Sequence, residues 1–318
     1  MVSVYIALYL FLAGAGGGAF LVGSAIDLVL RFRPGAARGW FFRVSSVTDA
    51  GLVAGPVLVA ASAGFLVLDL GVPERALSLF AAPTPSLLSL GAWSIALFVA
   101  LAAAAYLIGT AAPDGGDDPE ATLALPAVLA RIAEFACSIA ATGLALFVVV
   151  YSGVYLAAYP SLPFLNTAWV PALFVASALA SGLAVLLVVA FFRQGPETPR
   201  AVAALLPLDA VLVVVEAAAL VGLMARTFAV GEVEVASAVR LMTGDLALFF
   251  WLGVVGAGLL APLSVDAVCR RAPSLVAVAL GAGCTLIGSL CLRFVLLLAT
   301  ERFNLAFMSS LQFWISQL

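Results

Sequence analysis

Histidine and lysine are both missing from this chain of 318 residues. Without histidine, the chain cannot supply the two axial ligands of a bis-histidine haem, and it lacks the usual metal ligand and proton carrier of proteins. The four cysteines form no C-x-x-C pair and no ferredoxin-like run, which predicts small core side chains: Cys137, Cys269, Cys284 and Cys291. Any redox or proton chemistry must therefore use carboxylates, tyrosines or a group that a partner holds.

Charge is scarce as well, at 10% of the chain, whereas 65% of the residues are hydrophobic and the mean hydropathy is +1.22. These values predict an all-α integral membrane protein surrounded by lipid. The net charge of −3 comes with no basic patch, which excludes a nucleic-acid partner. About eight segments are long enough to span a bilayer. We expect helices at 4–30, 47–69, 87–109, 128–156, 167–192, 203–226, 245–265 and 274–299.

The basic residues, all of them arginines, predict the orientation. They gather in the loops after the first, fifth and seventh segments. The positive-inside rule then places these loops in the cytoplasm and both termini on the outer side of a bacterial cytoplasmic membrane. The first segment starts almost at Met1 without a basic region before it, so we expect it to be retained. A faint likeness between residues 10–15 and 173–178 suggests a parallel duplication. We therefore expect two four-helix bundles, residues 1–160 and residues 161–318, the second ending in an outer tail.

Carboxylates inside apolar segments are costly in a bilayer and point to a cavity, a partner or a function. Three of them lie toward the inner ends of the first, second and fourth segments: Asp27, Asp49 and Glu134. Each has an arginine within a few residues: Arg31, Arg43 and Arg131. The acids either pair with these arginines or form a proton path from the cytoplasm. Asp209 and Glu216 are seven residues apart and share a helix face, so a second polar track through the last four helices is equally compatible with the sequence.

Small and aromatic residues mark the outer half of the first bundle. Gly14 and Gly18 leave a bare helix face, which suits either close helix packing or the approach of a flat ligand. The surrounding G-x-G-x-x-A pattern lies in mid-helix and therefore does not indicate a nucleotide site. Tyr9, Asp69 and Tyr151 share the outer leaflet, where they form either one site or part of an interfacial aromatic belt.

Several local patterns resemble one family of membrane proteins. They are Tyr9 to Gly18, Asp69-Leu70-Gly71-x-Pro73-x-Arg75, Gly91-Ala92-Trp93, Tyr151 to Tyr155, Asn166 to Trp169 and, in the last helix, Arg293-Phe294-Val295. In these patterns the chain resembles the NrfD/PsrC family, the quinone-reactive membrane subunits of polysulfide-reductase-type complexes.

The resemblance implies an eight-helix anchor with no haem, iron–sulfur cluster or metal of its own. It implies electron exchange between menaquinone and a four-cluster ferredoxin-like iron–sulfur subunit on the outer face, together with a molybdopterin catalytic subunit. With the shared depth, it predicts a quinone contacted by Tyr9, Asp69 and Tyr151 in a pocket lined by Gly14, Gly18 and Trp93. In some relatives a histidine faces the quinone where Tyr9 stands here; tyrosine can donate a hydrogen bond but is a poorer proton relay. Arg293 joins Asp209 and Glu216 as polar candidates of the second bundle.

Two other functions remain open at this point. A small-solute or ion transporter is suggested by the duplication and the buried carboxylates. Helices broken by Gly or Pro at matching midplane positions of both halves would favour a transporter, and the sequence shows none. A purely structural anchor would make the outer polar residues dispensable. As a quinone-linked subunit, the chain would take part in respiratory electron transfer and, if the protons came from the cytoplasm, in proton translocation.

Overall fold

The computed structural model describes residues 4–32, 40–70, 87–111, 125–158, 162–193, 195–230, 232–272 and 274–299. Within these ranges, all the regular elements are helices. In chain order they are α1 (Val4–Phe32), α2 (Trp40–Thr48), α3 (Ala50–Leu70), α5 (Leu87–Ala111), α7 (Leu125–Ala157), α8 (Trp169–Arg193), α9 (Thr198–Val230), α10 (Glu232–Met242), the π-helix η2 (Phe249–Leu260), α11 (Ala261–Cys269) and α12 (Leu275–Ala299). Eight helical segments of the described ranges are long and apolar enough to cross a membrane, which confirms the predicted fold class.

Some bounds differ from those that the sequence predicts. The second span begins earlier, in α2, and a turn at Asp49 separates α2 from α3. The sixth span begins at Thr198 rather than at 203, because Pro199 fits the first turn of a helix, where its missing N–H group has no partner to lose. The seventh span changes type along its length: η2 passes directly into α11, which continues to Cys269.

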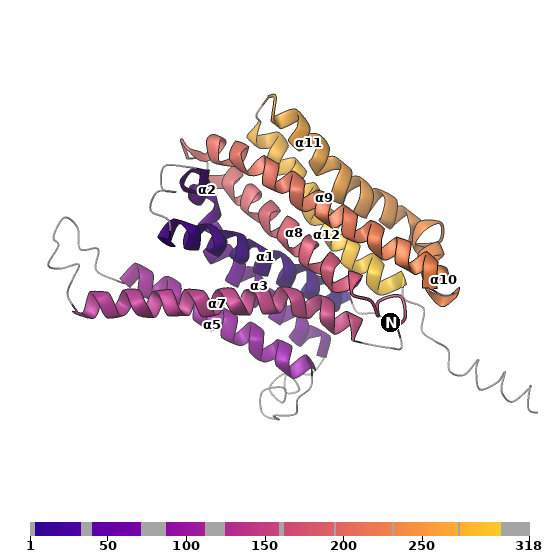
Figure 1. The fold of residues 1–318 in the computed structure, drawn as a ribbon, viewed down its shortest axis with the longest axis horizontal. Coiled ribbons are helices and arrows are strands. Elements are labelled where there is room, and N and C mark those ends of the chain that lie inside the picture. The colour runs from indigo at the N-terminus through magenta and orange to yellow at the C-terminus, as the bar shows by residue number, and fades with distance from the viewer. Residues whose placement is uncertain are drawn as a thin grey trace, which may run out of the picture.

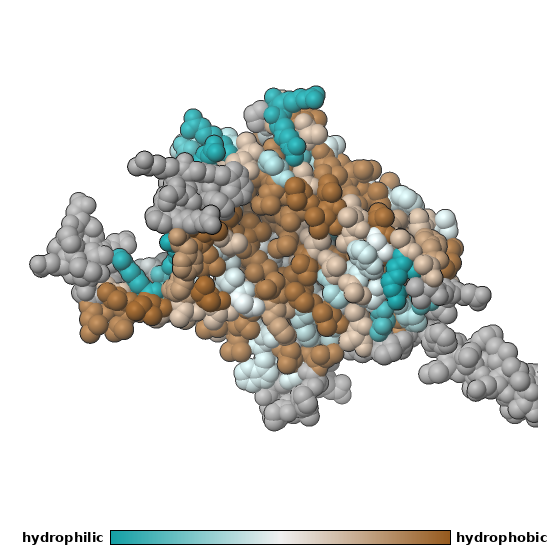
Figure 2. All heavy atoms as spheres, viewed as in Figure 1, coloured by the Kyte–Doolittle hydropathy of each residue, from teal (hydrophilic) through white to brown (hydrophobic). Residues whose placement is uncertain are grey.

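The helices lie side by side in two groups (Figure 1). α1, α3, α5 and α7 pack against one another, and α8, α9, α12 and the η2–α11 span form the other group. α1 also packs along α8, so the groups share a continuous interface. The start of α1 and helix α10 lie at the same end of the molecule in Figure 1. The apolar surface is broad across the middle of the molecule, and hydrophilic residues gather toward the two ends (Figure 2).

Glycines permit the closest helix crossings. Ala178 of α8 lies against both Gly14 and Gly18, which are one turn apart on α1, and a methyl group at Gly18 would overlap the carbonyl oxygen of Ala178. The η2 segment crosses α12 in the same way, through Gly258 and Gly288. Small residues allow such close backbone approach in membrane helices, where packing and hydrogen bonds drive association.

Candidate functional site

Tyr151 ties α7 to the beginning of α5. Its buried phenol donates a hydrogen bond to the carbonyl oxygen of Leu87 at 2.5 Å. The ring lies on the bare surface of Gly91, where an added Cβ would be 2.6 Å from Cε1 of the tyrosine. Phe147 and Tyr155 flank the ring on its own helix, with centroid distances of 5.7 and 5.8 Å. This arrangement explains why glycine stands at the start of α5.

The other outer candidates have different surroundings. Tyr9 belongs to the hydrophobic core and is 9% exposed, and its hydroxyl takes part in none of the hydrogen bonds found for the described residues. Asp69 lies half-buried at the end of α3, and Arg75, its predicted turn partner, falls outside the described residues. Trp93 of α5 is 47% exposed, so about half of its surface is not covered by the described residues.

The two glycines predicted to line the pocket lie at helix contacts. Gly14 faces Arg293, whose Nη2 would be 2.6 Å from an added Cβ, and Gly18 faces Ala178. These contacts fit close helix packing, which is one of the two roles that the sequence allowed for these glycines. A direct contact of either glycine with a quinone stays a prediction.

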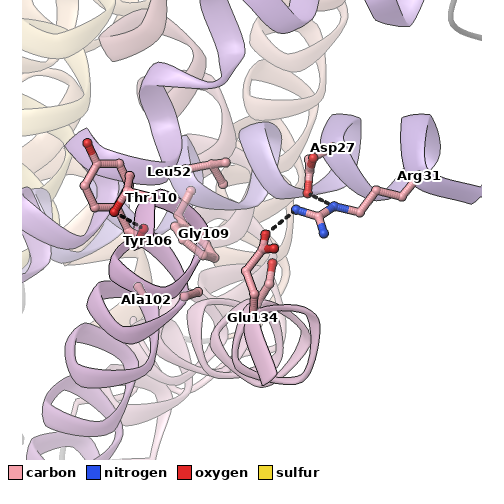
Figure 3. Close-up of a pocket in the computed structure, with 11 residues that line it drawn as sticks. Asp27, Arg31, Leu52, Ala102, Tyr106, Gly109, Thr110 and Glu134 are labelled. Atoms are coloured by element: carbon pink, nitrogen blue, oxygen red, sulfur yellow. Dashed lines mark hydrogen bonds and ion pairs between the residues drawn. The ribbon is translucent and has the colours of Figure 1, made fainter. Parts of the chain in front are cut away.

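Arg31 joins two of the inner carboxylates (Figure 3). Its Nε lies 2.8 Å from Oδ2 of Asp27 on the same helix, and its Nη2 lies 2.7 Å from Oε1 of Glu134 on α7. Glu134 thus pairs with an arginine from another helix, not with Arg131 of its own. Asp49 is exposed at the α2–α3 turn, within electrostatic range of Asp27.

The bridged pair borders a cleft of about 170 Å³ between α1, α3, α5 and α7. Tyr106 and Thr110 of α5 lie on the opposite wall of this cleft (Figure 3). The cleft is therefore a small, partly polar space near the C-terminal ends of α1 and α5, with its carboxylates held by a cation.

Arg293 is the largest fully buried side chain among the described residues, at 1% exposure. Its Nε donates to the carbonyl oxygen of Leu10 at 3.1 Å, and its Nη1 donates to Ser177 Oγ at 3.1 Å and to the carbonyl oxygen of Ser289 at 2.8 Å. The Ser289 hydroxyl is a further acceptor for Nη1. The guanidinium thereby connects α12 to both α1 and α8.

The charge of Arg293 has a buried counterpart in Glu216 of α9, which is 6% exposed. Glu216 lies close enough to Arg293 and to Ser177 to interact with both. Nη2 of Arg293 has no hydrogen-bond partner among the described residues. Ser177 therefore lies beside both the buried cation and the buried acid.

A pair of buried acids lies closer to the N-terminal end of α9 than Glu216 does. Asp209 of α9 and Asp266 of α11 are 2% and 3% exposed, and their carboxyl groups lie close enough together to interact electrostatically. The sequence indicated Asp209 but not Asp266, because the expected seventh segment stopped at residue 265. Ser289 is also a partner that spacing could have indicated, since it lies one turn before Arg293.

The described residues contain no group of three or more His, Cys, Asp or Glu side chains that could hold a metal ion. The polar clusters described above therefore consist of ionisable and hydroxyl side chains inside an apolar helical membrane protein.

Comparison with known proteins agrees with this class. The family model described as "Polysulphide reductase, NrfD" matches residues 2–304. The protein is 32% identical over 305 residues to the C subunit of polysulfide reductase from Wolinella succinogenes, a match that covers 94% of this protein and 93% of that subunit. It is also 32% identical over 160 residues to protein NrfD of Escherichia coli, covering 50% of each. The protein therefore belongs to the NrfD polysulphide reductase family, which confirms the resemblance found in the sequence.

Proposed function

We propose that this protein is the quinone-reactive membrane subunit of a multi-subunit oxidoreductase in a bacterial cytoplasmic membrane, with both termini on the outer side. The observation that carries the proposal is the nearly end-to-end match with the C subunit of polysulfide reductase, which covers 93% of that subunit. An anchor role in an oxidoreductase follows from the family. The quinone and the partners are further steps argued below, and the proposed orientation rests on the arginine-rich loops.

The donor set favours electron exchange with partners. The sequence has no histidine, and its described carboxylates and cysteines do not gather into a metal site. Such a set does not suit a haem or an iron–sulfur cluster held by this protein alone. By resemblance to the NrfD family, we propose that these partners are a four-cluster ferredoxin-like iron–sulfur subunit on the outer face, where the candidate quinone contacts lie, and a molybdopterin catalytic subunit beyond it.

Tyr9 supports a quinone on that side. A phenol that is 9% exposed, with none of the described hydrogen bonds, can donate to a carbonyl oxygen of a ligand. A quinone, menaquinone in our proposal, presents two such oxygens and supplies two-electron, two-proton chemistry when bound. The hydroxyl proton of Tyr151 is already donated to Leu87. In our proposal Tyr151 therefore shapes the quinone site rather than donating a hydrogen bond to the quinone.

The test is quinol oxidation by the purified complex with Tyr9→Phe, Tyr151→Phe and Asp69→Asn. One neutral hydrogen bond is worth about 0.5–1.5 kcal/mol, so we expect Tyr9→Phe to lower kcat/KM for quinol roughly 2- to 12-fold. Tyr106→Phe is the matched control, because Tyr106 lines the inner cleft and is 52% exposed. Extraction of the bound quinone from the wild-type complex identifies its type. Unchanged quinol oxidation in all three variants would contradict the quinone site and favour a purely structural anchor.

The transporter alternative gains little from the described residues. The seventh span contains the π-helix η2, but α5, its counterpart in a parallel duplication, is α-helical from Leu87 to Ala111. A transporter built from repeats is expected to interrupt helices at matching positions of both halves.

Proton uptake through Asp27, Asp49 and Glu134 remains a proposal. The bridge made by Arg31 supports the alternative in which these acids are held by ion pairs. A route through them would have to pass that bridge.

A further inference from the structure

Two acids, Asp209 of α9 and Asp266 of α11, face each other between two membrane-spanning segments. Both side chains are almost completely buried, at 2% and 3% exposure. Their carboxyl groups lie close enough together to interact electrostatically, and Oδ1 of Asp209 and Oδ2 of Asp266 have no hydrogen-bond partner among the described residues. Two buried carboxyl oxygens without donors are unusual, because buried polar groups are nearly always satisfied.

A proton resolves this arrangement. An ionised carboxylate can only accept hydrogen bonds, so two neighbouring carboxyl groups can satisfy each other once one of them carries a proton. Two negative charges in contact in an apolar interior would also repel strongly, and paired carboxylates elsewhere share one proton for this reason. The pair is therefore expected to carry one negative charge rather than two.

The neighbouring charges decide which acid carries the proton. Arg270 follows Asp266 by one helical turn, interacts with its charge and is exposed at the end of α11. Glu216 is the other charged group that faces Asp209, and it is an acid two turns further along α9. Asp266 thus has a nearby cation, whereas Asp209 has only acids as its ionisable neighbours among these interactions. This arrangement places the proton on Asp209.

We infer that Asp209 and Asp266 are a proton-binding site that holds one proton on Asp209 and takes it from the side of the membrane that Arg270 reaches. The site does not depend on a bound quinone. Further polar side chains lie between this site and α1: Glu216, Ser177 and Arg293. Arg293 donates to the carbonyl oxygen of Leu10, the residue after Tyr9.

Infrared spectroscopy of the purified full-length protein in lipid tests the inference directly. The carbonyl stretch of a protonated carboxyl group is separate from the amide bands, and carbon-13-labelled aspartate identifies the bands that belong to aspartates rather than to Glu216. We expect one protonated aspartate band in the wild type at neutral pH. Asp209→Asn should remove it, and Asp266→Asn should keep it at a shifted frequency, because the asparagine replaces a charged partner.

Asp245→Asn is the matched control. The Asp245 carboxylate is exposed and lies 2.9 Å from Nε of Arg240, whose guanidinium lowers the pKa of that carboxyl, so this aspartate adds no protonated band at neutral pH. Absence of a protonated aspartate band in the wild type, or a band that survives Asp209→Asn, would overturn the inference.

The side of access is tested in oriented proteoliposomes, by raising the pH on one side at a time. The aspartate band should decrease when the arginine-rich side is made alkaline. A decrease that follows only the opposite side would refute the assigned access. Neither result depends on quinol oxidation, so failure of the quinone proposal leaves this test unaffected.

Discussion

Arg293 should be among the most costly single positions in this protein to change. Arg293→Met keeps much of the side-chain length but removes the charge and all the donors to Leu10, Ser177 and Ser289. Hydrogen bonds between membrane helices average about 0.6 kcal/mol and reach about 1.7 kcal/mol. The two bonds that cross to α1 and α8 therefore account for roughly 1–3 kcal/mol.

Loss of the charge adds a larger contribution. Glu216 would remain buried without its cation, and removing one partner of a buried charge pair typically costs about 3–5 kcal/mol. Uptake of a proton by Glu216 can relieve part of this cost, because buried groups neutralise instead of staying charged. If this relief offsets about as much as the two hydrogen bonds contribute, Arg293→Met lowers the free energy of unfolding by about 3–5 kcal/mol in total.

A double-mutant cycle separates the two contributions. Glu216→Gln keeps the shape of the side chain but carries no charge that could be left unpaired. The double variant Arg293→Met/Glu216→Gln should therefore lose less free energy of unfolding than the two single variants lose together. The expected difference is about 1–3 kcal/mol.

The assay is reversible unfolding of the purified protein in mixed micelles, followed by circular dichroism. Arg226→Met is the control, because Arg226 lies near the C-terminal end of α9 beside an open cleft, and its loss should cost about 0.5 kcal/mol or less. A cost below about 1 kcal/mol for Arg293→Met, or strictly additive effects in the cycle, would refute the reasoning.

Two further predictions concern helix packing and the inner acids. Gly18→Val should destabilise the protein by roughly 1–3 kcal/mol or prevent folding, because its side chain would overlap Ala178, whereas Gly64→Val has open space and should be tolerated in the same unfolding assay. Glu134→Gln breaks a partly exposed ion pair worth about 0–1 kcal/mol, so stability and quinol oxidation should stay near wild type. A large loss of turnover-linked proton uptake in Glu134→Gln proteoliposomes would instead support the proton path through the inner acids.

The eight spans were predictable because each is a long apolar run, and this pattern depends little on tertiary context. Their details were less predictable. The π-helical geometry of η2 shifts hydrogen bonds by one residue without any change in composition, so hydropathy cannot reveal it. The same span shows why a small error in a boundary matters: an expected end at residue 265 left Asp266 outside the helix, whereas α11 continues to Cys269.

The candidate site depends on contacts between helices, which the sequence pattern does not specify. Ala178 fits between Gly14 and Gly18, and this contact fixes how α1 lies along α8. The same register brings Ser177, the residue before Ala178, and the carbonyl of Leu10, one turn before Gly14, to the guanidinium of Arg293. The glycine pair and the buried arginine therefore belong to one interface. A substitution that separates α1 from α8 at Gly18 should consequently disturb the bonds of Arg293 as well, so the Gly18→Val and Arg293→Met effects are expected to be less than additive.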